Sequence, residues 1–322
     1  MLSNTQFKIT NKAPTVLVLG GNGFIGRYTV AALNSYGIKT IIGSRRACTE
    51  AEGKTKRQIK LHHSICQKAW QPSLEGVDAV INTVGILRER KGESYDKVHH
   101  LAVAALSREC NKRNIPLVHM SAIGINDLLN NEFAKSKLRG EVAIQDSGCR
   151  GAIIRASIVN APDGYGSGWM YRVAKWPVWL IPAGATKFLC PIEAKDLGVA
   201  LAKLVISQLQ FKNQKLEVLE VGGAEILTLK DYLQKLRAQQ KCLPITPVLT
   251  IKIPRVIAKF FAKLFDVFHL TPYSIGHHEL LESDNIPNKN VLAQILGREP
   301  SVVGNDPEEL DATRSSHITK PA

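Results

Sequence analysis

Residues 15–26 read TVLVLGGNGFIG, a short apolar run followed directly by a glycine-rich turn. The run TVLVL has the β-branched and leucine composition of a buried strand. The segment after the turn, FIGRYTVAALNSYG at 24–37, places apolar residues at helical spacing and ends in glycine. The stretch therefore predicts a strand, a tight turn and a helix, in that order.

Gly20, Gly23 and Gly26 stand three residues apart in this turn. In the dinucleotide-binding fingerprint, the first glycine allows a tight turn, the second lets the backbone approach a pyrophosphate, and the third lets the helix pack closely on the sheet. The helix N-terminus adds unpaired N–H groups and partial positive charge. A glycine turn that serves only packing is the alternative. We predict a dinucleotide site made by the residues of the turn: Gly20, Asn22, Gly23, Phe24, Ile25, Gly26 and Arg27.

The end of the next expected strand, IKTII at 38–42, bears on which dinucleotide binds. A site selective for NAD(H) commonly places Asp or Glu about 20 residues further on, bonded to the ribose 2′-hydroxyl. This chain has no acid there before Glu50 and instead carries Ser44, Arg45 and Arg46. Guanidinium groups suit a 2′-phosphate, which a carboxylate would repel. We therefore expect NADP(H) to be preferred over NAD(H); a pair of solvated arginines is the alternative.

Strand-like and helix-like segments alternate through the rest of the first half. Strands are expected at 77–84, 115–124 and 151–159, with helices at 94–110 and 132–141. Continuous apolar strands that alternate with helices are typical of a parallel sheet covered on both faces. We predict an α/β protein with a Rossmann-type doubly wound parallel sheet and a small C-terminal lobe. Its parts are a dinucleotide-binding half at 1–160, the lobe at 161–310 with elements at 186–221 returning to the sheet, and a loose tail at 311–322.

The turn after the strand at 77–84 completes the predicted cofactor contacts. Thr83, Val84 and Gly85 would line the ribose and nicotinamide side of the cleft. A plain strand end is the alternative.

Several of these segments resemble a known family. GGNGFIG together with FAKSK at 133–137 is similar to the extended and atypical short-chain dehydrogenase/reductases, in the NAD-dependent epimerase/dehydratase superfamily. VINTVGIL, SYDKVHH, LVHMSAIG, CPIEAKDLGVAL and LEVGGAEILTLKDYL resemble one subgroup, the nucleotide-binding accessory subunit of respiratory complex I and its bacterial relatives. The resemblance implies a tightly held NADPH and, for the complex I subunit, a structural role without turnover. Other members are reductases, epimerases and dehydratases.

The resemblance also implies proton-transfer residues, and here the chain departs from the pattern. Lys137 matches the family lysine, which bonds the nicotinamide ribose, but Phe133 stands where the family has its proton-donating tyrosine. A phenyl ring has no proton to give. Ser121 lies near the family's serine, although Ala122 is an alternative for that position and a serine at a strand end also bonds local backbone. The catalytic candidates are Lys137 and Ser121, with Tyr95 and Tyr165 as replacements for the missing acid.

The bulk composition narrows the class of partner. The 322 residues carry 42 Lys and Arg against 28 Asp and Glu, a formal net charge of +14. Such an excess favours an anionic partner, but no nucleic-acid motif accompanies it, so we do not expect nucleic acid to bind. The six cysteines show no C-x-x-C spacing and adjacent histidines point apart, so no metal site is expected. No apolar run reaches the roughly 20 residues needed to cross a bilayer, and we expect a cytoplasmic protein.

Residues 254–268, PRVIAKFFAKLFDVF, are amphipathic at helical spacing, with basic residues on one face and phenylalanines on the other. A helix of this kind either lies in a membrane interface, contacts a partner, or docks on its own domain. The first two alternatives would make the protein peripheral to the inner membrane, with a membrane surface or a respiratory, quinone-related protein as its partner.

Two functions stay open from the sequence. The first is an NAD(P)(H)-binding protein of the complex I accessory-subunit type, with weak or no turnover because Phe133 replaces the usual Tyr. The second is an active NADPH-dependent reductase or dehydrogenase on a lipophilic carbonyl or quinone-type substrate, with Lys137 or a water as proton donor.

Overall fold

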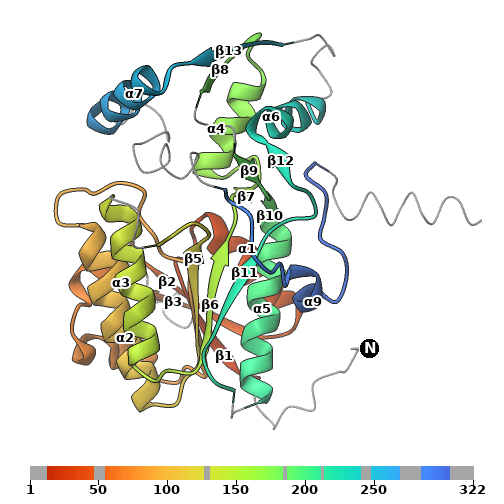
Figure 1. Cartoon of the computed structure of the whole chain (residues 1–322). Coiled ribbons are helices and arrows are strands. Elements are labelled where there is room, and N and C mark those ends of the chain that lie inside the picture. The colour runs from red at the N-terminus through yellow and green to blue at the C-terminus, as the bar shows by residue number, and fades with distance from the viewer. Residues whose placement is uncertain are drawn as a thin grey trace, which may run out of the picture.

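A seven-stranded parallel sheet forms the centre of the protein (Figure 1). The computed structural model describes residues 13–46, 55–126, 131–183, 187–211, 214–240, 248–268 and 284–304. The strand order is β11-β6-β5-β4-β1-β2-β3. The strands are β1 (Thr15–Leu19), β2 (Lys39–Ser44), β3 (Lys56–Gln58), β4 (Ala79–Asn82), β5 (Leu117–Ala122), β6 (Gly151–Ala156) and β11 (Glu217–Val221). The predicted Rossmann-type parallel sheet is confirmed.

Helices cover both faces of this sheet (Figure 1). One face carries α1 (Phe24–Ser35), α5 (Ala194–Gln210) and the short α9 (Leu292–Leu296). The other face carries α2 (Ala102–Lys112) with the π-helical turn η5 (Asp96–Leu101) before it, and α3 (Glu132–Asp146). Three 3₁₀ turns lie between β3 and β4: η2 (Leu61–His63), η3 (Gln67–Trp70) and η4 (Pro72–Leu74).

The alternation of β1 explains the two apolar cores. Val16 and Val18 pack in the cluster under α1 and α5, whereas Leu17 and Leu19 point to the opposite face and pack with α2. All four side chains are fully buried. Burial of each such side chain stabilises the fold by about 1.5–3 kcal/mol, so the apolar run at the start of the chain fixes the middle of the sheet.

A smaller lobe lies above the sheet, where the chain continues from the end of β6 (Figure 1). Its helices are α4 (Tyr165–Ala174), α6 (Leu229–Ala238) and α7 (Arg255–Phe268), and β8 (Val178–Pro182) pairs in parallel with β13 (Leu249–Ile253). Two short pairs join it to the body: β7 (Val159–Asn160) with β10 (Ile192–Glu193), and β9 (Phe188–Leu189) with β12 (Leu227–Thr228). Trp179 and Tyr232 form the centre of its own apolar cluster.

Of the predicted returning elements at 186–221, β11 joins the central sheet and α5 packs on it, while β9 and β10 pair outside it. The predicted tail at 311–322 lies outside the described residues. Within the described ranges, no helix has both the length and the apolar composition needed to span a membrane.

Candidate functional site

The glycine turn lies at the carboxyl end of β1 and needs glycine for steric reasons. Gly20 has a φ of +76°, in the left-handed region that favours glycine. A Cβ on Gly26 would lie 2.1 Å from the carbonyl oxygen of Gly20, and one on Gly23 would lie 2.9 Å from the same atom. The Gly23 N–H donates to this oxygen at 2.7 Å, and the Gly20 N–H donates to the Gly43 carbonyl at 2.9 Å. The turn is therefore closed and tied to β2.

The start of α1 offers its N–H groups to a ligand. Gly23 is the N-cap residue and provides no side-chain cap, and the first turn of the helix holds no acidic residue. Asn22 and Gly23 are exposed, with Phe24 and Ile25 half-buried behind them. A backbone cradle at a helix N-terminus, without a side chain to fill it, fits the pyrophosphate of a dinucleotide.

Arg27 is oriented toward the lobe. Its guanidinium pairs with the Asp163 carboxylate and donates to the Asp163 carbonyl at 3.1 Å. It also lies 5.6 Å from the ring centroid of Phe24 and 5.4 Å from that of Tyr28. Arg27 thus connects α1 to the loop before α4, and its predicted contact with the cofactor stays a prediction.

Arg45 at the end of β2 has an acidic partner that the local sequence did not indicate. Its Nη1 donates to both carboxylate oxygens of Glu93 at 2.8 Å, and His62 Nδ1 lies 3.4 Å from Glu93 Oε1. The Arg45 side chain is 60% exposed, whereas that of Glu93 is 12% exposed. The acid that the sequence lacks near the end of β2 is therefore supplied from the loop after β4. Ser44 donates to the carbonyl of Arg46 at 3.4 Å.

The residues after β4 are hydrogen-bonded to the end of β1, beside the glycine turn. The Thr83 hydroxyl donates to the Leu19 carbonyl at 2.8 Å, and the Val84 N–H donates to Asn82 Oδ1 at 3.1 Å. A Cβ on Gly20 would lie 3.0 Å from Thr83 Oγ1. The sheet order reverses between β1 and β4, and such switch points are where open α/β sheets bind ligands. Thr83, Val84 and Gly85 therefore line the same edge as the turn.

Lys137 reaches this edge from α3. Its Nζ donates to the Met120 carbonyl at 3.3 Å, and a Cβ on Gly85 would lie 3.9 Å from it. Burial lowers the pKa of Lys137 to about 8, although Glu141 acts in the opposite direction. Burial and the Lys137 ammonium also lower the pKa of His119 to about 3. The structure thus brings Lys137 to the predicted nicotinamide side as a cation with a weakened hold on its proton.

Where the family's catalytic phenol would stand, the structure has Phe133 within an aromatic cluster. The ring of Phe133 lies 5.9 Å from Lys137 Nζ and meets the rings of Tyr95 and His99 edge-on, at 5.8 and 5.5 Å between centroids. The Tyr95 hydroxyl donates to the Leu87 carbonyl at 2.8 Å. Burial and Lys137 hold the pKa of His99 well below its usual range. The cluster holds a hydrocarbon ring, a backbone-bonded tyrosine and a neutral imidazole.

Ser121 carries a buried hydroxyl at the end of β5. Among the residues that the structure describes, its Oγ has no hydrogen-bond partner, and the residue is 5% exposed. A buried hydroxyl left without a partner costs about 1–3 kcal/mol, and the predicted role of Ser121 toward a ligand stays a prediction. The alternation of β5 places Ser121 on the face opposite Met120, which is the face covered by α3.

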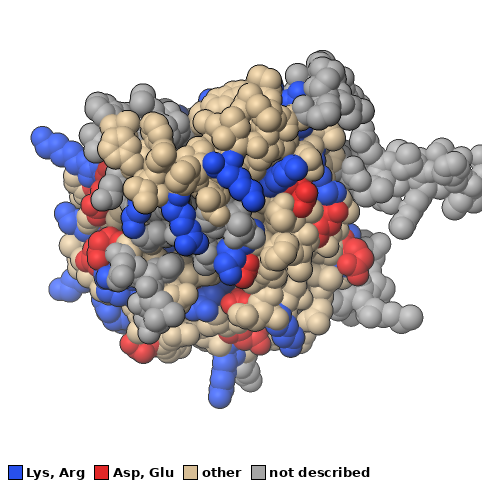
Figure 2. All heavy atoms as spheres, turned by 45° about the horizontal axis from the view of Figure 1, so that its top comes forward, with Lys and Arg blue, Asp and Glu red and all other residues tan. Residues whose placement is uncertain are grey.

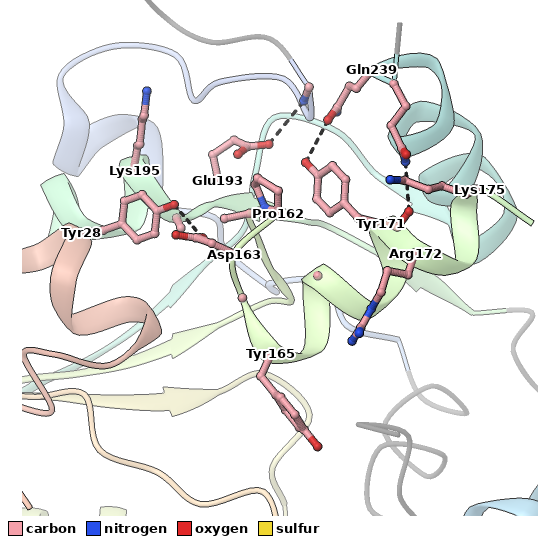
Figure 3. Close-up of a pocket in the computed structure, with 16 residues that line it drawn as sticks. Tyr28, Pro162, Asp163, Tyr165, Tyr171, Arg172, Lys175, Glu193, Lys195 and Gln239 are labelled. Atoms are coloured by element: carbon pink, nitrogen blue, oxygen red, sulfur yellow. Dashed lines mark hydrogen bonds between the residues drawn. The ribbon is translucent and has the colours of Figure 1, made fainter. Parts of the chain in front are cut away.

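A separate pocket of about 750 Å³ lies between α1, α4 and the start of α5 (Figure 3). Tyr28 donates to Asp163 at 2.9 Å on one side of it, and Tyr171 donates to Gln239 at 2.9 Å on the other. Burial raises the pKa of Tyr171 to about 12. Tyr165 points away from these groups in Figure 3. The described lining residues of this pocket include neither the glycine turn nor Lys137.

The charge distribution agrees with an anionic ligand. In Figure 2, Lys and Arg gather across the upper middle of the face turned forward, and Asp and Glu are interspersed with them below and to the right. The chain's net charge of +14 adds a long-range attraction for phosphate groups.

Known proteins resemble this chain in sequence and in fold. Residues 16–175 match the model of the NAD dependent epimerase/dehydratase family. A curated relative, NADH dehydrogenase (ubiquinone) 1 alpha subcomplex subunit 9, mitochondrial, of Dictyostelium discoideum, is 25% identical over 232 residues, which cover 67% of this chain and 61% of the relative. The chain therefore spans about 61% of that relative's length.

Solved structures give the same fold. MoeE5 in complex with UDP-glucuronic acid and NAD superposes with a TM-score of 0.61 at 15% identity, covering 94% of this chain and 99% of that one. The Thermus thermophilus UDP-glucose 4-epimerase complex with NAD has a TM-score of 0.59 at 17% identity, covering 89% and 94%. The suspected resemblance is confirmed: residues 16–175 match the NAD dependent epimerase/dehydratase family, and the solved structures share the fold of the whole chain.

Proposed function

We propose that this protein binds a nicotinamide dinucleotide at the carboxyl edge of β1, β4 and β5, with weak or no turnover, as a complex I accessory subunit would. The observation that carries the proposal is the contrast at this edge. The glycine cradle and Lys137 are in place, while Phe133 stands 5.9 Å from the ammonium with no proton to give.

Each group would have one task toward the nucleotide. The N–H groups at the start of α1 would hold the pyrophosphate. Lys137 would bond the nicotinamide ribose from the side of β5, and Ser121 Oγ would gain the partner it lacks. A bound nicotinamide supplies hydride chemistry, but an adjacent proton donor is needed to use it on a carbonyl.

An active reductase is the second candidate, and one observation favours it. Burial lowers the pKa of Lys137 to about 8, close to the range in which a general acid works at neutral pH. Lys137 or a water beside it would then protonate the oxygen of a lipophilic carbonyl or quinone-type substrate.

One experiment separates these two functions. The purified protein is first analysed by mass spectrometry for nucleotide that it retained. NADPH absorbance is then followed with a series of quinones and aldehydes, with Lys137→Ala as the matched variant. The proposal expects retained or tightly bound nucleotide and no consumption of NADPH above background. Turnover that disappears in Lys137→Ala would replace the first function with the second.

We also propose that NADP(H) is the preferred nucleotide, through Arg45 and Arg46. Charge reversal in Arg45→Asp/Arg46→Asp should weaken NADPH binding far more than NADH binding, because only NADPH carries the 2′-phosphate. Charge-assisted hydrogen bonds contribute about 1.5–3 kcal/mol each, so a loss of at least tenfold is expected for NADPH. Equal loss of both nucleotides would reject the preference.

A membrane surface is the proposed partner of α7. Val256 and Phe260 on this helix are 81% and 63% exposed, whereas Ala258 and Ala262 face inward and are buried. Over the side chains that the structure describes, the helix buries its alanines and exposes most of its large apolar residues, as a helix that contacts an external surface would. The paired strands β8 and β13 of the same lobe also carry exposed apolar residues: Leu180, Leu249 and Ile251. Contact of these apolar residues with the inner membrane would make the protein peripheral to it.

Vesicle co-sedimentation tests this partner. Wild type should sediment with anionic vesicles and less with neutral ones, and Phe260→Ser/Phe261→Ser should stay in solution. Equal sedimentation of wild type and variant would reject the membrane and leave a respiratory protein as the partner to seek.

A further inference from the structure

The Arg45–Glu93 pair lies where the ribose 2′ position of a bound dinucleotide is expected. Arg45 directly follows β2, and the glycine turn is bonded to the end of the same strand through the Gly43 carbonyl. Burial lowers the pKa of His62 on the other side of Glu93, so this imidazole adds little charge at neutral pH. Arg45 is the cation that the structure pairs with the Glu93 carboxylate.

The loop that carries Glu93 is held by backbone hydrogen bonds, and the Arg45 side chain is the more exposed member of the pair. Backbone bonds in both directions join Arg90 and Glu93, at 3.0 and 2.8 Å. Further along, the Tyr95 N–H donates to Glu89 Oε1 at 2.7 Å. The Glu93 carboxylate is 12% exposed and the Arg45 side chain 60% exposed, so the arginine is the partner that can move.

We propose that Glu93 sets the nucleotide selectivity of this site: it accepts the 2′-hydroxyl of NAD(H) and competes with the 2′-phosphate of NADP(H) for Arg45. The proposal rests on the proposed dinucleotide binding. Glu93 would take the place in space of the acid that NAD-selective relatives carry at the end of the second strand, although it comes from a different loop.

The charges explain the direction of the effect. A 2′-phosphate can pair with Arg45 only if the guanidinium leaves Glu93, and the phosphate would then lie beside a carboxylate of the same sign. A 2′-hydroxyl needs no such exchange, because it can donate to a carboxylate that keeps its arginine. Glu93 therefore lowers the affinity for NADP(H), raises that for NAD(H), and weakens the preference set by the two arginines.

Glu93→Gln tests this assignment, with Glu89→Gln as a control that removes the same charge from the same loop. Dissociation constants for NADPH and NADH are measured by calorimetry for wild type and both variants, and circular dichroism checks that each variant is folded. We expect Glu93→Gln to bind NADPH at least about tenfold more tightly, as loss of a competing charged hydrogen bond implies, and NADH more weakly. Glu89→Gln should leave the ratio of the two constants unchanged.

The outcomes separate this inference from the function beneath it. Binding of both nucleotides by wild type with an unchanged ratio in Glu93→Gln would overturn the role of Glu93 alone. An equal shift in Glu89→Gln would also overturn it, because a general charge effect would then suffice. Failure of wild type to bind either nucleotide would overturn the proposed function itself. Should Glu93→Gln not fold, Glu93→Ala and Glu93→Asp replace it. Glu93→Ala should change the two dissociation constants in the same direction as expected for Glu93→Gln, and Glu93→Asp should keep the wild-type ratio of the NADPH and NADH constants.

Discussion

Restoring the missing phenol by Phe133→Tyr gives the sharpest prediction about the chemistry of this site. Burial makes a tyrosine harder to ionise, but the Lys137 ammonium lies 5.9 Å from the ring centroid at position 133. At that distance, with an effective dielectric constant of about 20, Coulomb's law gives about 3 kcal/mol, or roughly two pKa units. The new phenol should therefore begin to ionise at lower pH than in the same site without the ammonium, by at most about two units, because Lys137 itself loses its proton near pH 8.

The assay is an ultraviolet difference titration of the phenolate, with Phe133→Tyr/Lys137→Met as the matched variant. Wild type serves as the baseline because the chain holds seven other tyrosines. Since the pKa of Lys137 is itself lowered to about 8, the two groups titrate as a pair, and the comparison between variants is made on the apparent pKa. The single variant should also gain NADPH consumption with any carbonyl that fits, by about 10²–10⁴-fold, the usual effect of a placed general acid.

Two results would refute this reasoning. The first is a phenol that titrates at the same pH in the single and the double variant, which would mean that Lys137 does not act on position 133. The second is a wild-type protein that consumes NADPH as fast as Phe133→Tyr, which would mean that the absent hydroxyl does not limit turnover.

Three further predictions concern the same edge of the sheet. Gly26→Ala should lower the free energy of unfolding, measured in urea, by about 1–3 kcal/mol or more, because its Cβ would lie 2.1 Å from the Gly20 oxygen. The control Gly166→Ala has open space around its Cβ and should not lower the free energy of unfolding. Between pH 8 and 10.5, the folded protein holds fewer protons on Lys137 than the unfolded protein does. The free energy of unfolding of wild type, relative to that of Lys137→Met, should therefore rise by about 3 kcal/mol across this interval. A difference that does not change with pH would contradict the lowered pKa of Lys137. Ser121→Ala should keep or gain stability because the hydroxyl has no partner among the described residues, yet should weaken nucleotide binding; a loss of stability without loss of binding would assign the hydroxyl to the fold.

Most of the fold could be predicted from local sequence patterns. The apolar run of β1, the spacing of Gly20 and Gly26, and the alternation of strands with helices each depend on neighbours in sequence, and the parallel sheet follows from them. The helix predicted at 254–268 also appears, as α7, because its period is visible in sequence. The exposure of its apolar face could not be predicted from that period, since an amphipathic helix has the same sequence pattern whether its apolar face packs on its own domain or faces solvent.

Contacts between distant segments were beyond the sequence. Glu93 lies 48 residues after Arg45, and only the path of the loop after β4 brings them together. The charged composition of that loop was the single available signal. The pocket between Tyr28, Tyr171 and Glu193 is likewise assembled from separate helices and strands, none of which has a motif that indicates it.

Calorimetric titration of NADPH into the 322-residue chain is the decisive measurement for the proposed dinucleotide site, with Gly23→Val as the matched variant. Gly23 has an extended backbone, but a Cβ there would lie 2.9 Å from the Gly20 carbonyl oxygen, so a valine distorts the turn that would hold the pyrophosphate. The account predicts one saturable site per chain in wild type and none in a folded Gly23→Val protein. No binding of NADPH or NADH by wild type, or equal binding by the variant, would contradict it.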